Sequence, residues 1–177
     1  KGEITNVAFV GDNEEVPTDP DITDTVNITG VKVNTPKDKV KEKEFITYTI
    51  ILSNSGNKEG NTIVKDKISE YTTFVEKSIK INDKETQYTQ NNLEDGISVS
   101  VPAGENTATL SFVVKVKPLE RENVEVKNIA IIDGNETNEV TNEAEKEKIS
   151  LTVNKIWSDN LIQAQKRPEK IKFILTK

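Results

Sequence analysis

The chain has 177 residues and a formal net charge of −6, and it contains no Cys, His or Met. Without Cys and His it can form no disulfide and no thiolate nucleophile, and it lacks the usual zinc ligands and the base of a Ser–His triad. Hydrophobic residues make up only 33% of the chain and charged residues 31%, so the periodicity of the apolar residues must decide between order and disorder.

The distribution of charge and apolar residues excludes further classes of protein. No run of about 18 apolar residues occurs, so nothing predicts a membrane span. The balance is acidic and the lysines are interspersed, which argues against nucleic acid and anionic membranes as partners. We therefore expect no nucleic-acid partner, no membrane contact in this segment, no metal and no cofactor. The abrupt ends at Lys1 and Lys177 predict a piece of a longer protein.

An alternation of apolar and polar residues predicts strands along most of the chain. Segments with this period of two are separated by turn clusters rich in Gly, Pro and Asn. The segments are residues 26–33, 46–52, 63–68, 79–81, 97–101, 107–116 and 126–132. Only Glu120–Asn123 and Glu143–Lys148 hint at helix, and we interpret both as connectors. The pattern predicts an all-β fold, an antiparallel Ig-like β-sandwich in which each strand buries one face.

A short internal similarity indicates a tandem array. Residues 4–14 resemble residues 126–136, and Asn6 aligns with Asn128 at an offset of 122 residues (128 − 6). We interpret residues 1–22 as the C-terminal hairpin of a preceding repeat and residues 23–148 as a complete β-sandwich repeat.

The chain changes character again near its C-terminal end. We interpret residues 149–177 as the first strands of a truncated third module, because so short a segment cannot bury a core alone. The oxygen-rich runs Asp12–Glu15 and Asp19–Asp24 lack the spacing of an EF-hand, which favours a solvated linker over a calcium site.

Three polar residues occupy the apolar phase of their predicted strands. Lys32 shares a phase with Val26 and Ile28, Asp66 lies between Val64 and Ile68, and Asn128 lies between Val126 and Ala130. Side chains two positions apart point to the same face of a strand, so all three are predicted to enter the core. Taken singly, each has an ordinary explanation: a lysine whose ammonium reaches water at a strand end, an aspartate in a turn, and an asparagine at a bulge. Gly30 is a possible bulge that would reverse the phase of Lys32.

Together these residues supply the chemistry of an intramolecular isopeptide bond. Burial lowers the pKa of a lysine and raises that of an aspartate, which favours a neutral amine beside a protonated acid. The amine of Lys32 would attack the carboxamide of Asn128, with Asp66 polarising the carbonyl and relaying protons, and ammonia would leave. This needs no His, metal or cofactor. The chain is then not an enzyme, because the reaction is a single self-cross-linking event.

Two parts of the sequence resemble known families of surface proteins. The run Glu44–Asn57, with Ile63–Ile68 and Val126–Ala130, resembles the signature of DUF11 repeats, which are similar to Cna A-type adhesin modules of Gram-positive bacteria. Lys43–Glu44 stands where those repeats usually have Gly–Asp. The resemblance implies Lys32, Asp66 and Asn128 as the isopeptide residues, although not every such repeat carries the cross-link.

The C-terminal piece resembles a second family. Residues 151–160 and 167–175 look like the opening of a Cna B-type domain, in which Lys155 matches the isopeptide lysine. The corresponding acceptor and acid would lie beyond Lys177. Within this chain Lys155 is also explained as a lysine that alternates with strand hydrophobes.

These resemblances imply an extracellular, cell-wall-anchored protein. The preferred hypothesis is a structural stalk repeat of an adhesin, with the neighbouring repeats of the same chain as its partners and a host extracellular-matrix protein bound through other domains. The alternative is a module that itself binds a matrix protein or glycan, for which the aromatic content of 5% offers little. A hydrolytic enzyme has no specific residue pattern behind it.

Overall fold

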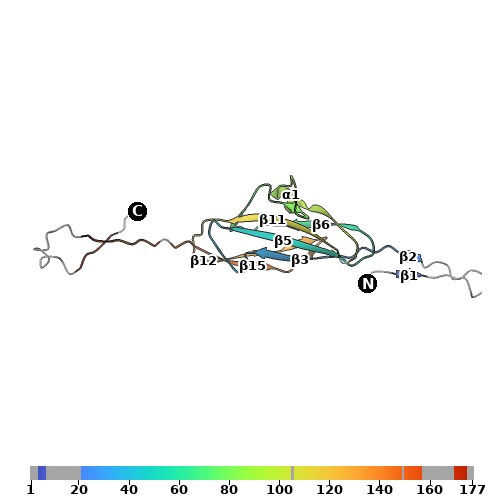
Figure 1. Cartoon of the computed structure of the whole chain (residues 1–177), viewed down its shortest axis with the longest axis horizontal. Coiled ribbons are helices and arrows are strands. Elements are labelled where there is room, and N and C mark those ends of the chain that lie inside the picture. Colours follow the sequence, from blue (N-terminus) through green and yellow to red (C-terminus); the bar gives the residue numbers. More distant parts are fainter. Residues whose placement is uncertain (1–3, 7–20, 105, 149, 157–169, 175–177) are drawn as a thin grey trace, which may run out of the picture. The chain divides into compact units, whose positions relative to one another are not determined.

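The chain divides into two compact units, Lys1–Glu147 and Lys148–Lys177. The computed structural model describes residues 4–6, 21–104, 106–148, 150–156 and 170–174. Within those residues, every strand and the one helix belong to the first unit (Figure 1).

The regular secondary structure of the first unit is almost entirely strand. Its strands are β1 (Ile4–Asn6), β2 (Asp21–Thr23), β3 (Ile28–Thr35), β4 (Lys39–Lys41), β5 (Phe45–Asn54), β6 (Gly60–Asp66), β7 (Thr72–Phe74), β8 (Lys80–Ile81), β9 (Lys84–Glu85), β10 (Ile97–Val101), β11 (Thr107–Val116), β12 (Asn123–Asn128), β13 (Ala130–Ile132), β14 (Asn135–Glu136) and β15 (Val140–Glu145). The helix is α1 (Gln90–Asp95), which follows a capping box formed by Thr89 and Asn92 and buries Leu93.

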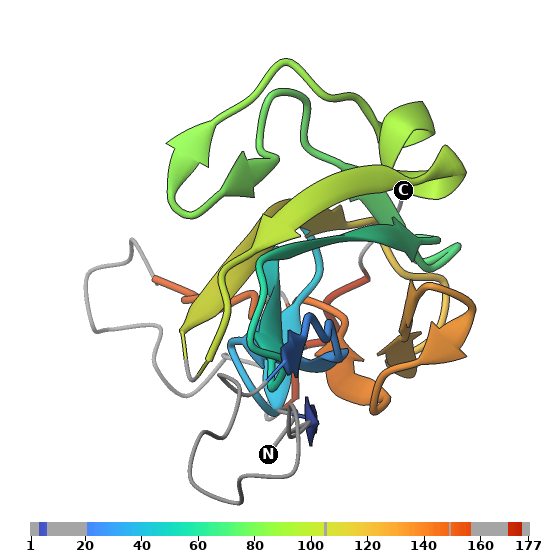
Figure 2. The same cartoon turned by 90° about the vertical axis from the view of Figure 1, so that its right-hand side faces the viewer.

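The strands pair into sheets that are antiparallel with one exception. The largest sheet has the order β3-β5-β11-β8-β9, and β7 also pairs with β11. The others are β10-β6-β13-β14, β12-β15-β4 and the hairpin β1-β2, and only β4 and β15 run parallel. Figure 2 shows the β8–β9 hairpin and α1 together at one side of these strands. The prediction of an all-β sandwich is confirmed.

The two long central strands build the core through strict alternation. Inward positions of β5 and β11 are fully or almost fully buried, whereas their outward positions carry mostly Thr, Ser and Val. The buried positions are Ile46, Tyr48, Ile50, Leu52, Ala108, Leu110, Phe112, Val114 and Val116. Apolar residues of β6, β10, β12, β13 and β15 complete the same cluster. A chain with few apolar residues thus buries one face of each strand and leaves the other to water.

Strand β3 is regular through Gly30, so the phase of Lys32 is retained. Gly30 pairs with Leu52 and Lys32 with Ile50 in one unbroken register. A Cβ atom on Gly30 would overlap Cδ1 of Ile132 and lie 3.1 Å from Cδ2 of Leu52. The glycine therefore permits close packing of β3 on β13 and does not mark a bulge.

The segment 126–132, predicted as one strand, is divided at Ile129. Its first part, β12, pairs with β15, and its second part, β13, pairs with β6. The buried positions Val126, Asn128, Ala130 and Ile132 keep the period of two across the break. One segment thereby joins two sheets.

The interpretation of Glu143–Lys148 as a connector is wrong for residues 143–145, which belong to β15. This strand lies between β12 and β4, and the backbone pairing on both sides outweighs the helix propensity of Glu143, Ala144 and Glu145. Residues 120–122 form no helix and connect to β12, whereas Asn123 already belongs to that strand. The sequence analysis also missed α1, a single short helix whose six residues show no clear apolar period.

The second unit shows no helix or strand among its described residues, 148, 150–156 and 170–174. These residues are exposed, including Leu151, Val153 and Ile156. Trp157 lies outside the described residues. The assignment of residues 149–177 to a truncated module remains a prediction, as does that of residues 1–22 to a preceding repeat.

The close approach at Gly30 leads to a first prediction. We expect Gly30→Ala to lower the free energy of unfolding by about 1–3 kcal/mol through overpacking against Ile132. In an Ile132→Val background, which lacks Cδ1, the same substitution should cost clearly less. Urea denaturation of the four proteins of this double-mutant cycle measures the difference, and an equal cost in both backgrounds would contradict the explanation.

Candidate functional site

The three predicted site residues are all buried and lie on three different strands. Lys32 lies on β3, Asp66 ends β6, and Asn128 ends β12. Their exposed fractions are 1%, 2% and 3%, respectively. The ordinary explanations given above, a lysine reaching water, an aspartate in a turn and an asparagine at a bulge, do not account for three side chains buried to this extent.

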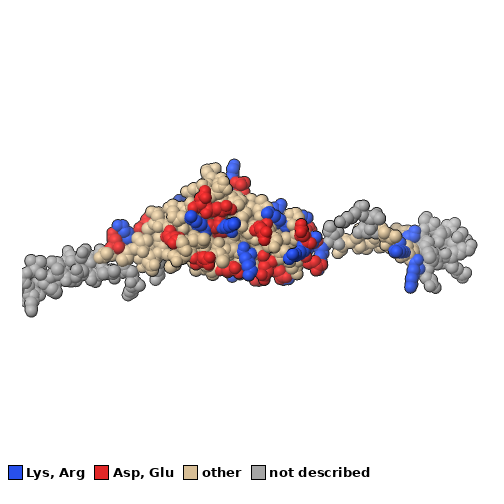
Figure 3. Space-filling model, turned by 180° about the vertical axis from the view of Figure 1, so that it is seen from behind, with Lys and Arg blue, Asp and Glu red and all other residues tan. Residues whose placement is uncertain are grey.

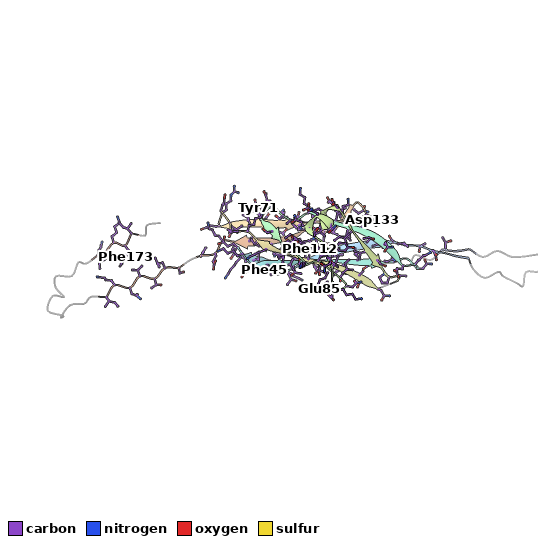
Figure 4. The ribbon with its side chains drawn as sticks, turned by 90° about the horizontal axis from the view of Figure 1, so that it is seen from above. Phe45, Tyr71, Glu85, Phe112, Asp133 and Phe173 are labelled. Carbon is purple, nitrogen blue, oxygen red and sulfur yellow. The ribbon has the colours of Figure 1, made fainter. Side chains whose placement is uncertain are left out.

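Lys32 and Asp66 form a direct ion pair inside the sandwich. The ammonium donates to Oδ2 of Asp66, and neither side chain is accessible to solvent. The amine also lies 4.8 Å from the ring centroid of Tyr48 and 5.1 Å from that of Phe112. Figure 4 shows Phe112 in the interior among the strands. Two aromatic faces therefore replace water around the nitrogen.

Burial shifts the pKa values of this pair in opposite directions. Desolvation lowers the pKa of Lys32, and the nearby Asp66 charge and hydrogen bond only partly oppose that shift. Desolvation also raises the pKa of Asp66. The charge and hydrogen bond of the Lys32 ammonium lower this pKa in part, and a hydrogen bond with the neighbouring Asn128 carboxamide lowers it least. Both directions favour transfer of the proton from the ammonium to the carboxylate. The site is therefore suited to hold a neutral amine beside a neutral acid.

Asn128 is held beside Asp66 by both backbone and side-chain contacts. Two residues further on, Ala130 pairs with Asp66 in the β13–β6 ladder. The Asn128 Nδ2 atom donates to the carbonyl oxygen of Lys67 at 3.3 Å. This contact leaves the carbonyl end of the carboxamide free for a different partner.

Buried oxygens without hydrogen bonds gather at this site. Among the residues that the structure describes, the buried side-chain atoms of this kind are Oη of Tyr48, Oδ1 of Asp66 and Oδ1 of Asn128. Unsatisfied buried polar atoms are rare and costly. A proton on Asp66 would allow its carboxyl group to donate to Asn128, which would satisfy two acceptor oxygens with one hydrogen bond.

The sequence analysis missed two kinds of residue at this site. Tyr48 and Phe112 occupy ordinary core phases, so nothing in the sequence distinguishes them from packing residues. Asn138 binds the backbone of Lys32 with its carboxamide, but it lies in the segment between β14 and β15 and follows no strand period. Only the three-dimensional structure brings these residues to Lys32.

No group of three His, Cys, Asp or Glu among the described residues could hold a metal ion. None of their helices is both long and apolar enough to cross a membrane.

No family model and no curated protein matches the chain. Among solved structures, the chain is similar to BcpA, the major pilin subunit of Bacillus cereus, with 14% identity and a TM-score of 0.48 over 80% of this chain. It spans 48% of the BcpA chain, about half its length.

Two other solved structures show weaker similarity. The alkylpurine DNA glycosylase AlkC of Pseudomonas fluorescens is 13% identical, with a TM-score of 0.39 over 68% of this chain and 30% of that chain. The CARDB domain of PF1109 from Pyrococcus furiosus is 15% identical, with a TM-score of 0.38 over 69% of this chain and 89% of that chain. All these TM-scores are below 0.5, so none of the similarities assigns a family or a function to this chain.

The buried pair leads to a prediction about pH. In Lys32→Met the lone Asp66 should stay protonated in the folded state, because burial already raises its pKa and the opposing ammonium is gone. The unfolded chain releases this proton near pH 4. Above about pH 4 the folded state then holds a proton that the unfolded state has lost, so stability should fall by up to about 1.4 kcal/mol per pH unit.

Urea denaturation of Lys32→Met at several pH values between about 4 and 7 measures this slope. The control is Lys32→Met with Asp66→Asn, which has no titrating group at the position. A slope shared by both proteins would assign the pH dependence to other groups and contradict the prediction.

Proposed function

We propose that this chain is a structural stalk repeat of a bacterial surface protein and that it is stabilised by an autocatalytic isopeptide bond between Lys32 and Asn128. The observation that carries the proposal is the buried Lys32–Asp66 pair with Asn128 beside Asp66, each residue contributed by a separate strand.

The proposed reaction balances without any added reagent. Asp66 takes a proton from the Lys32 ammonium and shares it with Oδ1 of Asn128, which polarises the carbonyl. The neutral amine attacks Cγ of Asn128, so that the Nζ–Cγ bond forms. Asp66 then relays one proton from Nζ to Nδ2, the Cγ–Nδ2 bond breaks, and ammonia leaves. The protein is the only substrate and reacts once, so the proposal includes no turnover activity.

The cross-link would have a large effect on the unfolded chain. It would join positions 96 residues apart (128 − 32). By the chain-entropy model for disulfides, closing a loop of about 100 residues contributes on the order of 4–5 kcal/mol to the free energy of unfolding. A chain without cysteine would thereby gain a covalent constraint that stabilises the fold about as much as a disulfide over a loop of that length.

The proposed location follows from the resemblance to DUF11 and Cna-type repeats. We place the protein outside the cell, anchored to the wall of a Gram-positive bacterium, with neighbouring repeats as its partners and any host ligand bound by other domains. On the face shown in Figure 3, acidic and basic side chains are interspersed. This distribution is compatible with a solvated stalk and lacks the single-sign surface that nucleic acid would require.

Binding of a host matrix protein or glycan by this module is the alternative function. It would need a continuous exposed apolar patch. The exposed Val31, Val33 and Phe45 lie on the neighbouring strands β3 and β5, but no described feature beyond these side chains points to a ligand. The stalk function is therefore the one that the site supports best.

The cross-link has a direct chemical test. We expect the intact mass of the folded chain to be lower than its sequence mass by one ammonia, because one Lys–Asn amide replaces an amine and a carboxamide. Lys32→Ala, Asp66→Ala and Asn128→Ala should each restore the full mass expected for their sequence. Tryptic digestion should yield a branched peptide that contains both Lys32 and Asn128. A wild-type mass equal to the sequence mass would refute the cross-link.

The mechanical role has a separate test. In single-molecule pulling on the full chain from its two ends, the segment between Lys32 and Asn128 should not extend, because tension passes through the amide bond. Asp66→Ala should release these 96 residues (128 − 32) and lengthen the extended chain by roughly 320–350 Å. Equal extension of the two proteins would contradict a cross-link that carries the tension.

A further inference from the structure

Lys32 lies on an edge strand whose free side is bound by one asparagine side chain. Strand β3 ends the order of its sheet, and β5 is its one partner among the strands that the structure describes. The Lys32 N–H donates to Oδ1 of Asn138 at 2.9 Å, and Nδ2 of Asn138 donates to the Lys32 carbonyl oxygen at 2.9 Å. The Asn138 carboxamide thus takes the place of a neighbouring strand at this single residue.

The residue before Asn138 is bound to β13, the strand that begins two residues after the acceptor Asn128. Thr137 N–H donates to the carbonyl oxygen of Ala130, and Ala130 N–H donates to Oγ1 of Thr137 at 3.1 Å. Ala130 pairs directly with Asp66 and follows Asn128 by two positions. Residues 137 and 138 therefore connect the backbone that carries the amine to the backbone beside the acid and the carboxamide.

We propose that Asn138 is a positioning residue for the cross-linking reaction: it fixes the backbone of Lys32 relative to Asp66 and Asn128 and so sets the rate of ammonia loss. This inference rests on the proposed function. Asn138 does not touch the reacting atoms and acts only through the Lys32 backbone. A reaction between two side chains is sensitive to displacements of about 1 Å, and an edge strand without this anchor can move away from the acceptor.

The chain offers a closely matched control in Asn142. Its carboxamide also binds the β3 end of the sheet through two hydrogen bonds, accepting from Nδ2 of Asn34 at 2.7 Å and donating to the Pro36 carbonyl oxygen at 2.8 Å. These bonds lie beyond Lys32 and do not touch its backbone. Asn142 is fully buried, whereas Asn138 is exposed, so Asn142→Ala should destabilise the fold more than Asn138→Ala.

The experiment compares the rate of cross-linking with stability. Three proteins are collected unfolded in denaturant, before any cross-link can form, and are refolded by dilution. They are the full chain and its variants Asn138→Ala and Asn142→Ala. Samples are quenched in acid at intervals, and the fraction lacking one ammonia is read from the intact mass. Stability is measured separately by adding each Asn substitution to Lys32→Met, which cannot cross-link.

We expect Asn138→Ala to lose ammonia roughly 5- to 10-fold more slowly than the wild type, because two hydrogen bonds to Lys32 are missing. Asn142→Ala should react at the wild-type rate although its fold is the less stable. Reaction of Asn138→Ala at the wild-type rate, or slowing of both variants in proportion to their loss of stability, would overturn the positioning role and leave the cross-link intact. A wild-type chain that loses no ammonia would instead refute the proposed function, and this inference with it.

Discussion

The rest of the structure depends on the cost of burying the Lys32–Asp66 ion pair. Removing two charges from water is expensive, and their mutual attraction offsets that cost only when the geometry is good. The sandwich provides this geometry from strands of different sheets and places the amine over the rings of Tyr48 and Phe112. The same desolvation that opposes folding lowers the pKa of Lys32 and raises that of Asp66. The buried Lys32–Asp66 pair therefore opposes folding and is, for the same reason, chemically reactive.

The sequence predicts the faces of strands well and their neighbours poorly. Alternation depends on local geometry, so the burial of Lys32, Asp66 and Asn128 could be predicted from period two alone. The division at Ile129 depends on the pairing of Ala130 with Asp66, 64 positions apart (130 − 66), and the pairing of β15 with β4 joins residues 104 positions apart (143 − 39). No local pattern encodes either. Helix propensity at residues 143–145 was overridden by that pairing. Asn138 shows the same limit at the site, because its role arises only where a loop meets an edge strand.

The position of β15 changes the mechanical interpretation of the proposed cross-link. Strand β12 is not the last strand of the repeat, so the bond between Lys32 and Asn128 leaves residues 129–147 outside the closed loop. That outer segment is held by its pairing with β12, β4 and β6 and by the side-chain bonds of Asn138 to Lys32 and of Asn142 to Asn34, both on β3. Tension on the C-terminal side would therefore reach hydrogen-bonded strands before it reached the covalent bond.

Formation of the amide would also remove the feature that makes the site reactive. The ion pair buries two charges, whereas the product holds an uncharged amide beside a protonated acid that can donate to it. After the reaction no lysine ammonium is buried, so the desolvation cost of that charge is removed. Burial thus favours the neutral amine before the reaction and the neutral amide after it. A single physical term, the cost of charge in an apolar core, accounts for both the reactivity of the site and the stability of its product.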